Sequence, residues 1–379
     1  MPFRVMVLGG YGNFGARIAR RLAQDALIEV IIAGKNSDAA CAYAEQLNTA
    51  VPPARVTSVT CDIQLTPSLI AAINQTQCNL VINTVGPFQG QDFCVATAVI
   101  TAGVDYLDLA DAREYVQHFQ QLDELARKHK VLAVTGASTV PGLSAAVIDH
   151  YLPEFAKLAS IDIGISPGNR APRGLATIRA VLSYCGQPLT QFRHGQWQTV
   201  YGWQGLVRRR YPNPMHTRWL SYCDVPDLLL FPERYPAVRT VIFRAGMELT
   251  VIQLGIWLLS WLARWRIVKH WPRYAKLLRS LSDLLLPFGS DVGGMHVELS
   301  GVDHHQRPLR ITWHVIAQQN DGPEIPCTAA VVIAQQLARG QIKQLGARPC
   351  LDLFSLDAFM LSLQGRAIQQ QVSREELRW

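Results

Sequence analysis

A cluster of glycines near the start of the chain has the spacing that a nucleotide-binding turn needs. Residues 9–15 read GGYGNFG, directly after the apolar run FRVMVL and before a helical pattern. In the GxGxxG register, Gly10 allows a tight turn, Gly12 lets the backbone approach a pyrophosphate, and Gly15 lets the helix pack close to the strand. The N-terminus of that helix would face the phosphates of a dinucleotide. We therefore predict a cofactor cradle made of Gly10, Tyr11, Gly12, Asn13, Phe14 and Gly15.

The residues at the end of the second strand predict which dinucleotide is bound. An enzyme that uses NAD usually carries Asp or Glu there, about 20 residues beyond the glycines, to bind the ribose 2′-hydroxyl. This chain has AGKN at 33–36, and Glu29 lies at the other end of the same strand. Lys35, with Asn36, would instead meet a 2′-phosphate as a cationic partner. We therefore predict NADP as the cofactor, with NAD as the alternative because Asp38 lies nearby.

Two later segments extend the predicted cofactor site. Asp62, which follows the third strand, could accept a hydrogen bond from the adenine amino group, or it could cap the next turn or helix. The fourth strand leads into a loop in which Pro fixes the backbone and Gly permits a close approach, so this loop should line the nicotinamide side. The site residues predicted from these two segments are Asp62, Ile63, Val85, Gly86, Pro87 and Phe88.

These residues must be positioned by a sheet, and the chain has the pattern of one. Short apolar runs alternate with helical patterns, the runs being 3–8, 27–33, 54–59, 79–83, 106–110 and 130–134. Strand and helix at this spacing predict an α/β fold with a doubly wound parallel Rossmann sheet, in which ligands bind at the carboxyl ends of the strands. Residues 1–135 should form this dinucleotide-binding domain.

A second domain with a mixed or antiparallel sheet is expected over 136–325. Segments 295–302 and 309–317 alternate as half-buried strands around a turn, whereas 183–236 reads as an irregular region rich in Trp, Tyr, Pro and Arg. This pattern predicts an α+β domain. Helices within 326–379 are expected to pack back on the Rossmann domain.

An apolar helix near 245–265 stands apart from the rest. Residues 251–263 read VIQLGIWLLSWLA, and a basic stretch follows with no acidic residue before Asp283. The run is too short to cross a bilayer, which needs about 20 apolar residues. Trp257, Trp261 and Trp265 would form one stripe that could lie at a membrane surface. Burial in the core or in a subunit interface is the other interpretation.

Four segments together resemble the saccharopine dehydrogenase-like family of NAD(P)-dependent oxidoreductases. They are AGKN at 33–36, VINTVGPF at 81–88, TAGVDYLDLADAREY at 101–115 and TGASTVPGLS at 135–144. The resemblance implies a Rossmann domain, a second α/β domain for substrate and dimer contacts, and a C-terminal stretch that returns to the first domain. It implies hydride transfer to or from a C=N, C=O or C=C bond. The Trp- and Arg-rich second domain indicates a substrate other than saccharopine, either small or lipid-like.

Residues that could act on the substrate are predicted from position alone. Asp108 and Ser138 follow the fifth and sixth strands on the carboxyl edge, and they are the candidate catalytic residues. Arg170 and Arg173 lie in a loop of the second domain that could hold an anionic substrate. Asp303, His304 and His305 lie in a predicted turn, so we expect no metal site.

Composition and missing motifs exclude several other classes. The 379 residues are 49% hydrophobic and 17% charged, so a folded core is expected. The glycines also fit GxxGxxG, but no tyrosine has a lysine four positions on, which argues against a short-chain dehydrogenase. The GxxxxGK[ST] and HExxH motifs are missing as well.

The same features set expectations for partners and compartment. The net charge of +7 is not gathered in basic blocks in the N-terminal half, so we expect no nucleic acid partner. Eight scattered cysteines without a CxxC pair favour a cytoplasmic protein over a disulfide-linked secreted one. The resemblance implies a homodimer through the second domain, and the 251–279 segment could contact a membrane surface. A non-catalytic NADP-binding sensor is the alternative function.

Overall fold

The computed structural model describes residues 2–172, 174–268 and 270–376, and it divides the chain into two compact units. Unit 1 comprises residues 1–143 and 324–363, and unit 2 comprises residues 144–323 and 364–379. The sequence placed the first boundary at 135, whereas the loop after β6 stays with unit 1 as far as Leu143. The C-terminal 326–379 is divided between the units.

Unit 1 is built on a seven-stranded, fully parallel sheet with the order β15-β6-β5-β4-β1-β2-β3. This confirms the predicted doubly wound Rossmann sheet. Parallel strands covered on both faces read as continuous apolar runs, and Val5 to Leu8 of β1 are fully buried. The strands are β1 (Phe3–Leu8), β2 (Ile28–Gly34), β3 (Val56–Thr60), β4 (Leu80–Asn83), β5 (Asp105–Asp108), β6 (Leu132–Thr135) and β15 (Gly346–Pro349).

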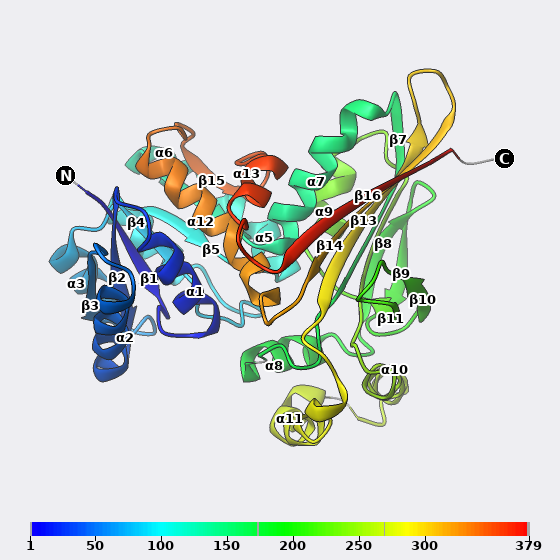
Figure 1. Cartoon of the computed structure of the whole chain (residues 1–379), viewed down its shortest axis with the longest axis horizontal. Coiled ribbons are helices and arrows are strands. Elements are labelled where there is room, and N and C mark those ends of the chain that lie inside the picture. Colours follow the sequence, from blue (N-terminus) through cyan, green and yellow to red (C-terminus); the bar gives the residue numbers. More distant parts are fainter. Residues whose placement is uncertain (1, 173, 269, 377–379) are drawn as a thin grey trace. The chain divides into compact units, whose positions relative to one another are not determined.

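The helices of unit 1 fall into packed groups, α3 with α4 and α6, and α1 with α12 and α13. Segments from both ends of the chain therefore lie side by side in this unit (Figure 1). The helices are α1 (Asn13–Leu22), α2 (Ser37–Ala50), α3 (Thr66–Thr76), α4 (Cys94–Thr101), α5 (Arg113–His118), α6 (Asp123–His129), α12 (Ile325–Ala338) and α13 (Leu356–Leu361).

Unit 2 contains a nine-stranded mixed sheet, as predicted for the second domain (Figure 1). Its central strand β7 runs parallel to β12 and antiparallel to β13. Ile161 and Ile163 of β7 are buried with Val297 of β13 and Trp313 of β14. The strands are β7 (Lys157–Ser166), β8 (Pro188–Arg193), β9 (Gln196–Tyr201), β10 (Val207–Arg210), β11 (Thr217–Tyr222), β12 (Thr240–Ala245), β13 (Gly293–Val302), β14 (Pro308–Ala317) and β16 (Ile368–Glu376).

The region 183–236 is not irregular, because it contributes four strands and a helix. Strands β8 and β9 form a hairpin, and β8 pairs with β12. Strand β11 also pairs with β12, and β10 pairs with β11 at the end of the sheet. The prediction was wrong because Trp, Tyr and Arg interrupt the apolar alternation while these half-exposed strands still pair. The helices of unit 2 are α7 (Ser144–Tyr151), α8 (Leu175–Ser183), α9 (Asp227–Arg234), α10 (Thr250–Arg264) and α11 (Ala275–Asp283).

Candidate functional site

The glycine turn after β1 has a geometry that only glycine permits at two positions. Gly9 has a φ of +72°, in the left-handed region, and its N–H donates to the carbonyl oxygen of Ala33 at 2.8 Å. A Cβ on Gly15 would lie 2.2 Å from the carbonyl oxygen of Gly9. Gly15 therefore lets α1 begin directly against the turn.

The outer side of the turn fits an anionic ligand. A Cβ on Gly12 would meet only the carbonyl oxygen of Gly9, at 3.0 Å, and both Gly12 and Asn13 are exposed. Gly12 is the N-cap residue of α1, and the first turn of this helix carries no acidic side chain. Free N–H groups and the positive end of the helix dipole favour a phosphate there. The residues present thus fit the pyrophosphate of a dinucleotide.

Tyr11 connects the glycine turn to the end of β2. A Cβ on Gly34 would lie 2.5 Å from the Tyr11 ring, so only a glycine leaves room for the ring there. The Tyr11 hydroxyl accepts a hydrogen bond from the backbone N–H of Asn36 at 3.1 Å. Asn36 in turn caps α2, because its side chain accepts from the N–H of Ala39 at 3.0 Å. The predicted 2′-phosphate role of Asn36 therefore competes with capping.

Lys35 lies between Gly34 and Asn36 in the sequence and is exposed at the carboxyl edge of the sheet. Glu29, the carboxylate of the same strand, lies at the opposite end of β2 and pairs with Arg4 at 3.3 Å. Asp38 lies exposed in the first turn of α2. The end of β2 thus offers a lysine where a carboxylate would bind the 2′-hydroxyl of NAD.

Asp62 has the turn-capping geometry that the sequence left as an alternative. Its carboxylate accepts from the N–H of Gln64 at 3.0 Å, and its own N–H donates to the Ser68 hydroxyl at 3.1 Å. Ile63 beside it is half-buried. One carboxylate oxygen is therefore engaged in holding the loop after β3.

The loop after β4 is fixed by side chains that the sequence reasoning did not select. Asn83 accepts from the N–H of Val85 at 3.0 Å and donates to the Tyr106 hydroxyl at 3.2 Å. The Thr84 hydroxyl donates to the carbonyl oxygen of Leu8 at 2.7 Å, which joins the loop to the end of β1. A polar pair at the end of a buried strand was the signal that could have identified them.

The rest of this loop is held by packing and by one amide. Gln91 donates to the carbonyl oxygens of Val85 and Pro87, at 3.3 and 2.7 Å. Phe88 is buried against the Tyr115 ring, with 5.4 Å between the ring centroids. The predicted residues Val85 to Phe88 thus form an ordered loop at the carboxyl edge.

Asp108 is fully buried and holds the end of β5 to the loop after β6. One of its carboxylate oxygens accepts from the Thr135 hydroxyl and the Gly136 N–H, both at 2.8 Å, and from the Ala110 N–H at 3.0 Å. Burial raises the pKa of this carboxyl to about 6, although the three donors oppose the shift. The three hydrogen bonds are those of a carboxylate that holds the fold together, whereas the raised pKa is a feature often found in functional carboxylates.

Ser138 lies in the same loop, two residues beyond Gly136. Its side chain is 7% exposed, and its N–H donates to the carbonyl oxygen of Gly136 at 2.7 Å. Ser138 thus lies in the loop to which the Asp108 carboxylate is bonded, at the carboxyl edge of the sheet.

Arg170 binds the backbone of unit 2 itself. Its guanidinium donates to the carbonyl oxygens of Leu286 and Pro287, at 3.4 and 3.1 Å. These bonds join the 168–170 loop to the segment after α11. Arg173 lies outside the described residues.

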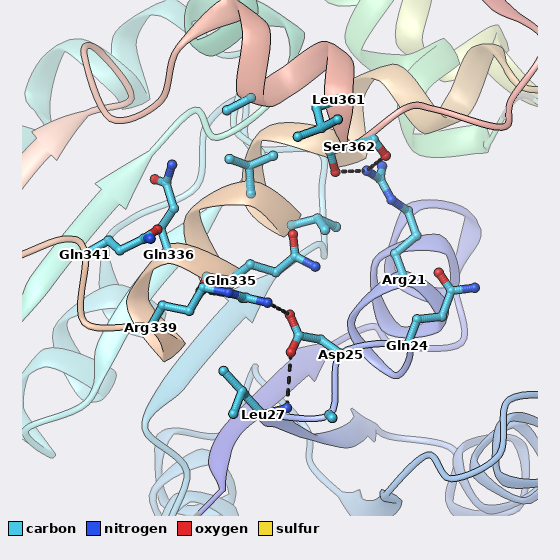
Figure 2. A pocket seen from close by; sticks show the side chains of 14 residues that line it. Arg21, Gln24, Asp25, Leu27, Gln335, Gln336, Arg339, Gln341, Leu361 and Ser362 are labelled. Carbon is cyan, nitrogen blue, oxygen red and sulfur yellow. Dashed lines mark hydrogen bonds and ion pairs between the residues drawn. The ribbon is translucent and has the colours of Figure 1, made fainter.

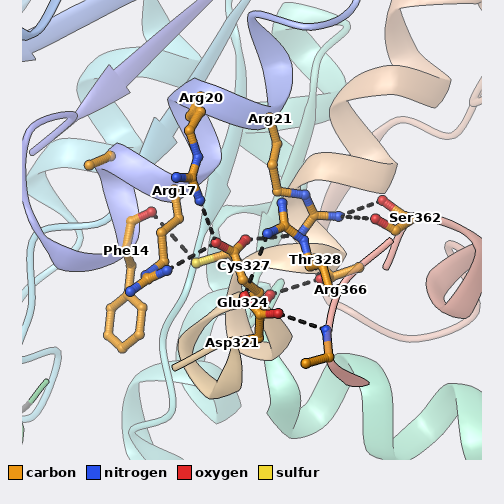
Figure 3. A network of polar contacts seen from close by, with 12 residues as sticks. Phe14, Arg17, Arg20, Arg21, Asp321, Glu324, Cys327, Thr328, Ser362 and Arg366 are labelled. Carbon is orange, nitrogen blue, oxygen red and sulfur yellow. Dashed lines mark hydrogen bonds and ion pairs between the residues drawn. The ribbon is translucent and has the colours of Figure 1, made fainter. Parts of the chain in front are cut away.

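A buried ion-pair cluster fixes α1 against the returning C-terminal segment. Glu324 is fully buried, and its carboxylate receives Arg17 at 3.0 Å and Arg20 at 2.9 Å, with Arg21 at 3.8 Å (Figure 3). Arg21 also donates to the Thr328 hydroxyl at 2.7 Å. The glycine turn leads directly into α1, so this cluster helps to position the cofactor cradle by holding the helix that follows it.

A separate pocket of about 750 Å³ lies at the other end of α1 (Figure 2). Asp25 and Arg339 pair across it at 2.7 Å, and Arg21 binds Ser362 at its rim. The glycine turn lies at the N-terminus of α1, so this pocket does not belong to the cofactor site. Among the described residues no cluster of three or more His, Cys, Asp or Glu could hold a metal ion.

The comparisons with known proteins agree with this site. Residues 5–137 match the family model of the saccharopine dehydrogenase NADP binding domain. The N-terminal unit carries a saccharopine dehydrogenase-type NADP-binding domain. NADP is therefore its cofactor, and the domain is one of an oxidoreductase family. No curated protein matches the sequence.

One solved structure shows the same fold beyond the NADP-binding domain. Saccharopine dehydrogenase (L-Glu forming) from Saccharomyces cerevisiae is 14% identical, with a TM-score of 0.68 over 98% of this chain and 100% of that chain. Biliverdin reductase from Synechocystis sp. PCC 6803, solved with biliverdin and NADP+, is 15% identical with a TM-score of 0.43, over 96% of each chain. The first of these shows that the chain has the saccharopine dehydrogenase fold.

Proposed function

We propose that this chain is an NADP(H)-dependent oxidoreductase that transfers a hydride to or from a C=N, C=O or C=C bond of a small or lipid-like substrate. When bound, the nicotinamide supplies or accepts the hydride. The observation that carries the proposal is the carboxyl edge of the unit 1 sheet. There the Gly12 turn, the N-terminus of α1 and the exposed Lys35 together offer sites for a pyrophosphate and a 2′-phosphate.

We propose further that the substrate is not saccharopine. A substrate with several carboxylates requires cations that are free to bind it. Arg170 is engaged with backbone carbonyl oxygens, and three further arginines of unit 2 face carboxylates. Arg209 pairs with Glu298 at 2.6 Å, Arg244 with Asp162 at 2.6 Å, and Arg218 with Glu248 at 3.4 Å. These pairings support a substrate of lower charge.

Asp108 and Ser138 remain our candidates for interaction with the substrate. Ser138 lies in the loop after β6, and Asp108 at the end of β5 is hydrogen-bonded to that loop through the Gly136 N–H, which supports this. The raised pKa of Asp108 would let the carboxyl hold a proton at mildly acidic pH. A homodimer through unit 2 also remains a prediction.

Calorimetric titration with NADPH and NADH tests the cofactor part. Lys35→Asp should weaken NADPH binding by roughly tenfold or more, since a hydrogen bond to a charged group contributes about 1.5–3 kcal/mol. It should not weaken NADH binding, because a carboxylate at this position can accept a hydrogen bond from the ribose 2′-hydroxyl. Lys128→Asp, an exposed lysine on α6, is the matched control. Equal losses in the two variants would refute the role of Lys35.

Oxidation of NADPH in the presence of imines, ketones and enoyl compounds tests the hydride transfer. We expect turnover with one of these classes and none with saccharopine and NADP+. NADPH binding without turnover of any of these substrate classes would favour the sensor function instead. Binding of neither cofactor would refute the oxidoreductase proposal.

A further inference from the structure

Helix α10 buries a polar and small-residue face and exposes an apolar one. Its buried residues recur at helical spacing and are Gln253, Ile256, Ser260 and Ala263. Its exposed large side chains are Val251, Leu254 and Leu258, which are 61%, 41% and 54% exposed. An ordinary surface helix has the reverse arrangement.

The inward face of α10 is fully used by the fold. Gln253 accepts from the N–H of Met247 at 2.8 Å and donates to the Ser221 hydroxyl at 2.9 Å. Gly186 approaches the helix so closely that a Cβ there would lie 2.2 Å from the carbonyl oxygen of Ser260. Ile256 packs into a buried cluster with Trp203. The outward residues are therefore not needed to attach the helix.

Apolar exposure continues beyond α10 into the next elements. Trp265 and Ile267 follow the helix and are 63% and 65% exposed. In and after α11 the exposed apolar residues are Leu277, Leu281, Leu284 and Phe288. Residues 251–288 thus hold nine of the fifteen exposed large hydrophobic side chains of the described chain. Exposed apolar side chains gathered in one stretch of chain are typical of a region that binds a partner or a membrane.

Basic side chains accompany this apolar surface. Within 250–289 the described and exposed basic residues are Arg264, Arg266, Arg273, Lys276 and Arg279. Asp283 is the one acidic residue in this stretch of sequence, and it lies 3.7 Å from Arg279. The surface therefore combines apolar side chains with a net positive charge.

We propose that residues 250–289 dock unit 2 on an anionic lipid surface. Among the described residues no helix has the length and apolarity to pass through a membrane, and α10 has 15 residues, so it would lie along the surface. Trp257, Trp261 and Trp265 form a row along α10, with ring centroids 6.2 and 5.5 Å apart. Tryptophan favours the level of the lipid headgroups.

Charge favours a lipid surface over a second copy of the chain. In a two-fold dimer through this face, the same patch of both copies would be buried, so two surfaces of net positive charge would face each other, and like charges at an interface oppose association. Anionic headgroups neutralise the same residues and contribute about 1 kcal/mol per basic residue near the surface. Docking does not depend on bound cofactor, so it goes beyond the proposed function.

Sedimentation with vesicles tests the proposal on the full chain. We expect binding to vesicles of phosphatidylcholine with phosphatidylserine, and at least tenfold weaker binding to phosphatidylcholine alone. Leu258→Ser with Trp265→Ser should lower the partition coefficient tenfold or more, because apolar contacts with the lipid are lost. The double variant should still fold, because both side chains are exposed. Leu65→Ser with Leu361→Ser, at apolar residues of unit 1 that are 57% and 63% exposed, is the matched control.

A charge variant and the oligomeric state complete the test. Lys276→Glu should weaken binding to the anionic vesicles on the order of tenfold, whereas Lys128→Glu should not. NADPH affinity, measured in parallel, should be unchanged in every variant, so a failure here is distinct from a failure of the proposed function. Absence of vesicle binding by the unaltered protein would overturn the proposal. So would conversion of a dimer into monomers by the Leu258 and Trp265 double variant.

Discussion

Loss of the Glu324 carboxylate should loosen the cofactor cradle without touching the cofactor site. Glu324 is fully buried, and Arg21, which faces it, is only 4% exposed. Removing one partner of a buried ion pair costs about 3–5 kcal/mol, because the remaining charges stay uncompensated. For a unit of this size that corresponds to a fall in melting temperature of roughly 6–20 °C. Glu324→Ala should therefore destabilise unit 1 strongly.

The measurement must report on unit 1. All nine tryptophans lie in unit 2, so tryptophan fluorescence would follow the wrong unit. Hydrogen exchange resolved by peptide, with urea as the perturbant, gives the opening free energy of α1 and α12 separately. Glu324→Gln, which keeps an oxygen acceptor, should lose about half as much stability as Glu324→Ala.

Glu376→Ala is the comparison for an exposed ion pair. Glu376 meets Arg307 at 3.0 Å, and both side chains are more than half exposed. Such a pair contributes about 0–1 kcal/mol. If Glu324→Ala costs no more than Glu376→Ala, the buried cluster does not hold α1. An unchanged NADPH affinity in a destabilised Glu324→Ala protein would refute the link from this cluster to the glycine turn.

Two further predictions concern the glycine turn and the acid stability of unit 2. Gly15→Ala should weaken NADPH binding at least tenfold by calorimetry, because its Cβ would lie 2.2 Å from the Gly9 carbonyl oxygen, whereas Gly255→Ala in α10, where a Cβ meets open space, should not. Burial, reinforced by Arg209, lowers the pKa of His314 to about 4, so the unfolded state takes up this proton first as the pH falls. Stability from this group should be complete above about pH 6.5 and lost toward pH 4, by up to about 3 kcal/mol. Urea midpoints at several pH values should show this loss, and His314→Gln should reduce it; an equal loss in that variant would contradict the assignment.

The sheet of unit 1 was predictable because its strands are marked locally. Each predicted run matches an observed strand to within about two residues. The central strands are recognisable because a strand buried on both faces has a continuous apolar sequence, whereas the edge strand β3 (VTSVT) is marked by its β-branched residues. Strand β15 (Gly346–Pro349) was missed because GARP has no such pattern, and its pairing with β6 joins residues more than 200 positions apart. Strand β16 was missed for a related reason, since IQQQVSREE lies at a sheet edge with mostly exposed side chains.

The orientation of α10 was not predictable from its sequence. VIQLGIWLLSWLA is apolar on nearly every face, so hydrophobic periodicity does not select the buried side. Hydrogen bonding selects it instead. Gln253 would be costly against lipid or in an apolar core without partners, and Ser221 and Met247 supply them. The polar residue is thus buried, and Leu254 and Leu258 face outward.

Position at the carboxyl edge of a sheet tells where a side chain lies, but the side chain's own bonds determine what it can still do. Asn36, Asp62 and Asp108 were all placed at that edge by the sequence, and each uses an oxygen to hold a loop or to cap a helix. A side chain engaged in this way must give up part of the fold before it binds a ligand. Lys35 is exposed at the same edge, which is why changing it should affect the choice of cofactor more than the stability of unit 1.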